Sequence, residues 1–307
     1  IFTRRGTGPA HLSAWARGGT YGTREGELSA LGGSERFGYS LSAAQHNTNG
    51  IYDVNSAARN GTYSARLRLT PDARSDVSLT LRYVDAGAHI ATNGNGVPND
   101  SNQTHTERRF IGSLDAGRFF TSRLEGRVSL GATDADARSE DRPDSPDDSD
   151  FPFDSRSRLY RRTADARLTF HLAPDATVTG GGSYETQHQR STGNNPEERT
   201  VRAGYAQLAG TSFSRLSYTG GIRLDHNSTF GDFTSARGGL AYELASATRV
   251  HAAAGSAFRE PTFEESSSNQ PFDVGNPHLH PERTRSWEAG IEQDVARGRA
   301  SIGATYF

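Results

Sequence analysis

Apolar and polar residues alternate one by one through much of this chain, which is the period of a β-strand whose two faces meet different surroundings. In residues 216–225, Leu216, Ile222 and Leu224 fall on one face and Arg223 falls on the other. The same alternation occurs in residues 63–70, 124–130 and 163–170. The polar face carries Arg and Asp as well as Ser and Thr. This pattern predicts an all-β fold with one apolar and one charged face.

The connections between the expected strands alternate in length. Strand centres are expected near residues 16, 27, 41, 65, 81, 112, 128, 165, 182, 206, 221, 240, 254, 289 and 303. From the second strand onward the connections are short (32–36), long (48–60), short (70–76) and long (87–106), and this order continues to the end. Tight turns at one rim and long loops at the other are typical of an antiparallel, up-and-down outer-membrane β-barrel. A soluble β protein is the alternative.

The composition agrees with strands that cross a membrane. Only 33% of the residues are hydrophobic and 34 are glycine, and no run of about 18 apolar residues exists that would span a bilayer as a helix. In a wide transmembrane barrel the apolar residues face lipid and the polar residues face a wet lumen. Aromatic residues near strand ends are expected to form interfacial girdles, although each alone also suits a soluble core. They are Tyr39, Tyr83, Phe170, Tyr184, Tyr205, Tyr242 and Phe307.

Several function classes receive no support from the residues. The chain has no Cys and no Met, so it has no disulfide framework and no thiolate metal site. Its formal net charge of −2 gives no general attraction to nucleic acid. It has no Gly-x-Ser-x-Gly elbow, no His-Glu-x-x-His helix and no phosphate-binding glycine loop. We therefore expect neither an enzyme nor a nucleic-acid-binding protein.

An acidic segment, residues 133–154, is expected to form one of the long loops. It contains nine acidic residues and two arginines. Its spacing does not fit an EF-hand, but clustered carboxylates supply the hard oxygen ligands that calcium prefers. The candidate calcium ligands are Asp144, Asp147, Asp148 and Asp150. The alternative is a solvated acidic loop that binds no metal, and in that case the protein has no cofactor.

A proline-rich segment near the end of the chain carries an unusual set of residues. Its motif consists of Phe258, Arg259, Pro261, Gly275, Asn276, Pro277, Leu279, Pro281, Glu282, Trp287 and Glu288. Prolines interrupt strand pairing and stiffen a loop, and glycine permits a turn. Glu282 is expected to pair with Arg259 or Arg283 where the loop rejoins the wall. We therefore interpret the segment as a rim structure that shapes the external mouth, and a direct ligand contact is the alternative.

This motif resembles the barrel of TonB-dependent outer-membrane receptors, in which a Phe-Arg/Lys-x-Pro strand end leads through Gly-Asn-Pro-x-Leu-x-Pro-Glu to a Trp-Glu strand. The resemblance implies a plugged barrel of 22 strands in the outer membrane of a Gram-negative-type bacterium. Residues 1–8 resemble the end of the plug or its linker, and residues 9–307 resemble a partial barrel of about 15 strands. The plug would precede Ile1 and about seven strands would follow Phe307. A smaller complete barrel that ends at Phe307, such as a passive porin, is the alternative.

The resemblance also implies partners and a ligand class. The expected partners are outer-membrane lipid, a TonB energy-coupling protein that acts through the missing plug, and a small-molecule or metal-chelate ligand. Residues 222–293 are most similar to the cobalamin-receptor branch, so a cobalamin-like corrinoid is expected first and a ferric siderophore second. In that branch, aspartates in extracellular loops bind calcium. Here the loop 48–60 offers only Asp53, and the acidic run lies in residues 133–154.

Overall fold

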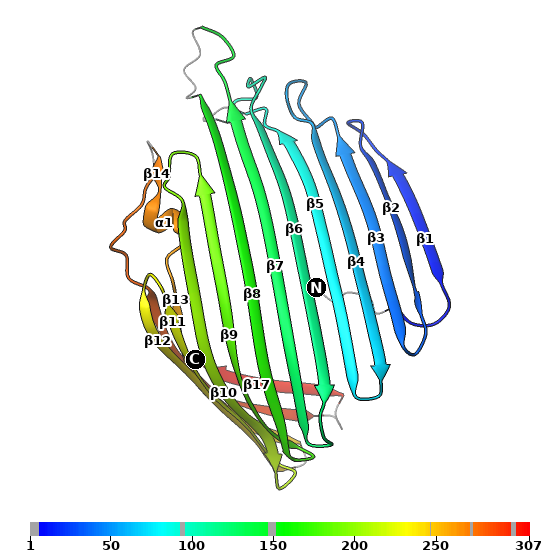
Figure 1. The fold of residues 1–307 in the computed structure, drawn as a ribbon, viewed down its shortest axis with the longest axis vertical. Coiled ribbons are helices and arrows are strands. Elements are labelled where there is room, and N and C mark those ends of the chain that lie inside the picture. Colours follow the sequence, from blue (N-terminus) through cyan, green and yellow to red (C-terminus); the bar gives the residue numbers. More distant parts are fainter. Residues whose placement is uncertain (1–5, 93–95, 147–151, 246, 271–272, 296–298) are drawn as a thin grey trace.

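The computed structural model describes residues 6–92, 96–146, 152–245, 247–270, 273–295 and 299–307. One antiparallel sheet of fifteen strands accounts for almost all of them (Figure 1). The strands are β1 (His11–Gly18), β2 (Arg24–Gly33), β3 (Phe37–Thr48), β4 (Ala58–Asp72), β5 (Ser75–His89), β6 (Thr104–Phe119), β7 (Leu124–Asp141), β8 (Phe153–Ala173), β9 (Ala176–Ser191), β10 (Glu197–Ser212), β11 (Leu216–Asn227), β12 (Gly231–Ala245), β13 (Thr248–Arg259), β16 (Glu282–Val295) and β17 (Ala300–Tyr306). Each expected strand centre lies inside one of them.

The strands follow an up-and-down order. Each pairs with its neighbour in sequence, and β13 pairs with β16 across a segment that contains a short helix, α1 (Phe263–Ser267), and a small hairpin of β14 (Asn269–Gln270) and β15 (Asp273–Val274). Within the described ranges, β1 and β17 are not paired with each other. No helix among the described residues is long and apolar enough to cross a membrane. The expected antiparallel meander is confirmed, but α1 was not expected.

The two ends of the sheet differ, as the loop lengths predicted. Residues 34–36, 73–74 and 120–123 are short connections at the end that is lowest in Figure 1, whereas residues 49–57, 90–92 and 96–103 lie in loops at the opposite end. The expected alternation is wrong at residues 192–196 and 228–230, which are short although long loops were expected there. The long loop expected over residues 133–154 is wrong in extent. Strand β7 continues to Asp141 and β8 begins at Phe153, because alternating Arg and Asp side chains on the two strands pair with each other.

The two faces of the sheet have opposite character. On one face, Leu168, Leu224 and Leu240 are 54%, 56% and 57% exposed. On the other, Arg127 Nη2 lies 2.9 Å from Asp76 Oδ1 and Arg223 Nε lies 2.9 Å from Asp225 Oδ1. So much apolar surface is stable in lipid rather than in water. We call the apolar face outward and the charged face lumenal.

The aromatic residues divide between these faces. Tyr83 stacks on Tyr63 with ring centroids 6.2 Å apart on the outward face, as an interfacial girdle requires. Tyr205 instead donates a 2.8 Å hydrogen bond to Asp165 Oδ2, and Asp165 also pairs with Arg167 at 3.3 Å. The expectation that Tyr205 belongs to a girdle is therefore wrong, because its hydroxyl has a partner on the lumenal face.

Candidate functional site

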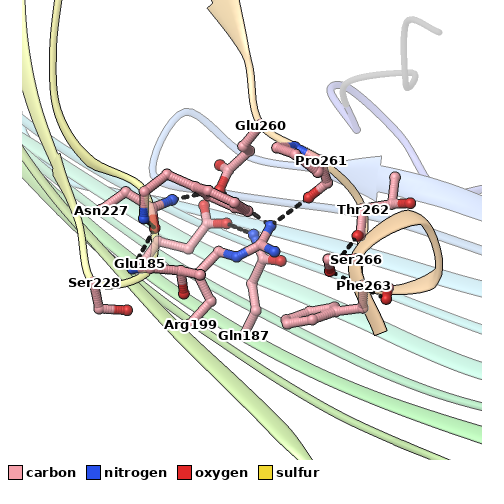
Figure 2. Close-up of polar contacts among 12 residues, drawn as sticks. Glu185, Gln187, Arg199, Asn227, Ser228, Glu260, Pro261, Thr262, Phe263 and Ser266 are labelled. Atoms are coloured by element: carbon pink, nitrogen blue, oxygen red, sulfur yellow. Dashed lines mark hydrogen bonds and ion pairs between the residues drawn. The ribbon is translucent and has the colours of Figure 1, made fainter. Parts of the chain in front are cut away.

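The candidate site lies where the chain leaves β13 and returns to β16. Residues 260–281, which we call the rim segment, include α1, β14 and β15. Figure 2 shows the start of this segment lying against the ends of wall strands, with side chains from β9, β10 and the end of β11 directed toward it. The rim segment is thus attached to strands that precede it in sequence by more than 30 residues.

Arg199 on β10 is the centre of this attachment. Its side chain is only 4% exposed, and Nη1 lies 3.1 Å from Glu260 Oε2 and donates a 2.9 Å hydrogen bond to the carbonyl oxygen of Pro261. The guanidinium carbon also lies 4.8 Å from the ring centroid of Phe230 and 4.5 Å from that of Phe263. A buried cation is tolerated only when it is paired, and aromatic faces add further stabilisation. Arg199 therefore holds both Glu260 and α1 against the wall.

Asn227 at the end of β11 completes the contact. It is 1% exposed, and its Nδ2 donates a 2.5 Å hydrogen bond to the same Glu260 Oε2. Its Oδ1 accepts hydrogen bonds from the backbone N–H groups of Thr229 and Phe230 at 2.8 and 3.1 Å. Asn227 therefore orders the turn that places Phe230 over Arg199. We call Arg199, Asn227, Glu260 and Phe263 the rim latch.

Polar side chains continue down the lumenal wall from the latch. Gln187 donates a 2.5 Å hydrogen bond to Glu185 Oε1, and Arg161 Nη2 lies 2.7 Å from Glu185 Oε2. Figure 2 shows Glu185 and Gln187 beside Arg199. The latch is thus the upper end of a paired polar surface that faces the lumen.

The first turn of α1 is closed by a reciprocal pair of hydrogen bonds. Thr262 Oγ1 accepts from the Glu265 N–H at 3.1 Å, and the Glu265 carboxylate accepts from the Thr262 N–H at 2.7 Å, which is a capping box. Arg259 Nη2 also donates to Glu265 Oε1 at 2.8 Å. Together, the backbone hydrogen bond from Thr262 and the one from Arg259 lower the pKa of Glu265. The ionised carboxylate therefore stabilises the start of the helix.

The second half of the rim segment packs against α1 at Gly275. A Cβ at this position would lie 2.5 Å from the backbone nitrogens of Ser267 and Ser268, which no side chain tolerates. The Gly275 N–H donates to the Ser268 carbonyl oxygen at 2.6 Å, and the Asn276 N–H donates to the Glu265 carbonyl oxygen at 2.9 Å. Only glycine permits this close approach.

The structure brings part of the sequence motif together. Arg259, Pro261, Gly275 and Asn276 all contact the latch or α1, and the expected ion pair between Arg259 and Glu282 is present, with Nη1 3.3 Å from Oε1. A direct ligand contact by these residues stays the alternative to a rim role.

The other motif residues do not join the latch. Pro277 and Pro281 lie in the connection that leads into β16. Trp287 lies on the outward face of β16 with its ring centroid 5.4 Å from that of Tyr306. Glu288 is paired in register with Ala253, so it lies on the lumenal face. Trp287 and Glu288 therefore build the wall.

The sequence did not reveal four important members of the site. Arg199 and Asn227 occur in strands that contain other polar residues, Glu260 lies unnoticed between two motif residues, and Phe263 resembles any loop aromatic. The capping pattern of Thr262 followed by Glu265 was a usable signal for α1.

Of the four expected calcium ligands, only Asp144 lies within the described residues. Asp144 accepts hydrogen bonds from the Ser101 hydroxyl, from the Ser101 N–H at 2.9 Å and from Asn102 Nδ2 at 2.6 Å, and these contacts lower its pKa. Asp147, Asp148 and Asp150 lie outside the described residues. No group of three or more His, Cys, Asp or Glu side chains that would hold a metal occurs within the described part of the chain. Asp144 therefore joins two loops, and calcium binding remains a prediction.

Comparison with known proteins identifies the family. Residues 8–307 match the family model described as "TonB dependent receptor-like, beta-barrel". The chain belongs to the TonB-dependent receptor β-barrel family. Proteins of this family lie in the Gram-negative outer membrane, so the apolar outward face lies in that membrane. A vitamin B12 transporter, BtuB of Photobacterium profundum, is 28% identical over 142 residues, which are 45% of this chain and 22% of that protein.

Solved structures share the fold. A mutant of the ferric enterobactin receptor of Pseudomonas aeruginosa in complex with enterobactin has a TM-score of 0.74 and 14% identity, with 99% of this chain and 54% of that chain covered. The copper transporter OprC has a TM-score of 0.72 and 18% identity, with 95% and 52% covered. The siderophore receptor PirA of Pseudomonas aeruginosa has a TM-score of 0.71 and 18% identity, with 98% and 54% covered. The chain thus spans about half the length of these receptors.

Proposed function

We propose that the intact protein is an outer-membrane importer that takes up a scarce, large nutrient with energy from a TonB-type partner. The observation that carries this proposal is the match of residues 8–307 to the TonB-dependent receptor barrel. The energy-coupling partner would act through a plug domain, with residues 1–8 as its end or linker. Import rather than catalysis is proposed, since the family consists of receptors and transporters.

The rim latch has a structural role in this proposal. Arg199 and Asn227 hold Glu260 from two wall strands, and Gly275 packs the rest of the rim segment onto α1. A loop that is fixed at both ends presents its exposed side chains in a constant arrangement, which lowers the entropic cost of binding. The latch therefore shapes the mouth, and ligand choice is assigned to the exposed parts of the long loops.

For the ligand we propose a cobalamin-like corrinoid. The support is the 142-residue similarity to a vitamin B12 transporter. Calcium bound by Asp144, Asp147, Asp148 and Asp150 is proposed as an accessory to this site. Asp144 would then exchange its hydrogen bonds to Ser101 and Asn102 for the metal.

A ferric siderophore is the second candidate. Arg161 and Arg259 lie on the lumenal side with 51% and 54% of their side chains exposed, and such cations suit an anionic chelate. Both arginines already pair with carboxylates, so their attraction for an anion is reduced. The solved siderophore receptors support only the fold at 14–18% identity. The corrinoid therefore ranks first.

The test is a titration of the intact purified receptor with cyanocobalamin and, separately, with ferric enterobactin, each with calcium present and then chelated. Saturable binding of cyanocobalamin supports the corrinoid, and weaker binding after chelation supports the calcium site. Binding that chelation leaves unchanged removes the metal from the proposal. Binding of ferric enterobactin alone replaces the corrinoid with a siderophore. If neither binds and both cross the membrane without saturation, passive diffusion is the better account.

A further inference from the structure

A row of charged side chains crosses the outward face of five neighbouring strands. The strand register pairs Asp85 with Arg108, Arg108 with Asp136, Asp136 with Arg158, and Arg158 with Arg190, from β5 to β9. Paired residues lie on the same face of an antiparallel sheet. The row therefore forms one continuous surface on the lipid side of the wall.

This charged row lies directly above a row in which four of the five side chains are rings and the fifth is Asp134. Each strand carries a member of this second row two residues nearer to its apolar middle than the charged residue. In register, these members are Tyr83, Phe110, Asp134, Tyr160 and His188. Below Tyr160 on the same face of β8 lies Arg162, which is paired with Asp134 at 2.7 Å, and then the apolar residues Ala164, Ala166, Leu168 and Phe170. Tyrosines mark the level of the lipid headgroups. The charged row is thus placed beside the headgroups and their phosphates.

Positive charge exceeds negative charge when the two arginines that flank this row, Arg59 on β4 and Arg156 on β8, are counted with it. Asp85 lies between Arg59 at 2.9 Å and Arg108 at 3.6 Å. Asp136 lies between Arg156 at 2.6 Å and Arg158 at 3.3 Å. With Arg190, five guanidinium groups therefore meet two carboxylates. We call Arg59, Arg108, Arg156, Arg158 and Arg190 the arginine row.

The neighbouring charges do not remove this excess. Arg162 Nη1 pairs with Asp134 at 2.7 Å, and Arg138 Nη2 lies 2.7 Å from Asp154 and 3.1 Å from Glu140. The positive and negative charges of these neighbouring groups cancel or nearly cancel. In the arginine row, by contrast, each carboxylate holds two guanidinium groups in place without neutralising both. The side chains of Arg59, Arg108, Arg156 and Arg158 are 42–68% exposed on this face.

We propose that the arginine row binds the phosphate groups of an anionic lipid in the outer leaflet of the membrane. Guanidinium groups bind phosphate oxygens through paired N–H donors. Basic side chains at a membrane surface attract anionic lipid at about 1 kcal/mol each. A lipid is favoured over free phosphate because the aromatic row and the apolar band lie immediately below, where the acyl chains of the same molecule would lie.

The test uses the intact receptor in a neutral detergent with a fluorescent diphosphoryl lipid A as the probe. The variant R108Q/R158Q/R190Q removes three of the five cations. By the figure of about 1 kcal/mol for each cation, we expect binding to weaken at least ten-fold. The variant R108K/R158K/R190K keeps the charge and should bind within about three-fold of the wild type. The matched control is R82Q, since Arg82 lies on β5 but on the lumenal face, and it should bind like the wild type.

Three outcomes would overturn the proposal: unchanged binding by R108Q/R158Q/R190Q, equal binding of a lipid A without phosphate groups, or equal loss of binding in R82Q. Competition by inorganic phosphate at the same concentration as the lipid would point to a free-anion site instead. Heat-modifiable migration on gels shows whether each variant is folded. If the triple variant does not fold, R190Q alone is measured, because Arg190 is not part of a carboxylate pair in the described structure, and it should bind about five-fold more weakly.

Discussion

Arg199 Nη1 lies 3.1 Å from Glu260 Oε2, although 61 positions separate the two residues in the sequence. The ion pair joins the lumenal face of β10 to the first residue after β13. Because Arg199 is almost completely buried and Glu260 is 28% exposed, the pair is better shielded from water and salt than the exposed pairs along the wall.

Substitution R199A is expected to release the rim segment. It leaves the Glu260 carboxylate, which is 28% exposed, with Asn227 as its remaining side-chain donor, and loss of a hydrogen bond to a charged group costs roughly 1.5–3 kcal/mol. Hydrogen exchange and protease cleavage within residues 260–281 should increase strongly, while the wall strands stay protected. R199K should lie between R199A and the wild type, because lysine keeps the charge but not the planar group between Phe230 and Phe263. Unchanged protection in R199A would contradict the latch.

Substitution G275A is expected to displace α1 from the second half of the rim segment. The new Cβ would lie 2.5 Å from the backbone nitrogens of Ser267 and Ser268, and overpacking of this kind costs roughly 1–3 kcal/mol. Thermal unfolding and proteolysis of the intact receptor measure the effect. G220A is the matched control, since a Cβ at Gly220 meets nothing within 4 Å. Equal stability of G275A and G220A would contradict the close approach of Gly275 to α1.

Acid is expected to loosen α1. Hydrogen bonds from Thr262 and Arg259 lower the pKa of Glu265 below its ordinary value of 4.5, so the folded state binds its proton less readily than the unfolded state. The stabilisation is therefore complete above that ordinary value and is lost as the pH falls through the lower folded value. Hydrogen exchange of residues 262–268, measured from pH 6 to pH 3, should rise at the acid end. In E265Q this part of the pH dependence should be absent, and an unchanged profile would exclude Glu265 as its source.

Alternation of the wall is tested by single cysteines along β11 in the intact receptor, which is convenient because the present chain has no cysteine. Cysteines at Tyr218, Ile222 and Leu224 should react with lipid-soluble reagents, and those at Thr219 and Arg223 should react with water-soluble reagents. The physical reason is the two-residue period of a strand between lipid and lumen. A period of three to four residues in the labelling would contradict the barrel.

The sequence was sufficient for the wall because local rules determine it. Alternation placed Leu224 and Arg223 on opposite faces, and the loop rhythm predicted the order of strands. Local rules failed where ion pairs with residues on another strand determine how far a strand extends. Asp134 and Asp136 were expected in a loop, but Arg162 and Arg156 on the opposite strand pair with them at 2.7 and 2.6 Å and extend the sheet.

The rim shows the same division. The turn at Gly275 and the ion pair between Arg259 and Glu282 could be predicted from the residues of the motif itself. The role of Arg199 did not, since nothing near it in sequence indicates that Glu260 and Phe263 will cover it. Burial of that arginine is a property of the folded rim and not of its own strand.

Energy-coupled uptake tests the central claim most directly. Cells that carry the intact receptor are given labelled cyanocobalamin, with and without a functional TonB-type energy-coupling protein, and initial uptake rates are measured over a range of concentrations. We predict saturable uptake that falls to the background rate when the coupling protein is absent. Uptake that is unsaturable and independent of the coupling protein, or the absence of uptake in both strains, would contradict active import of a corrinoid.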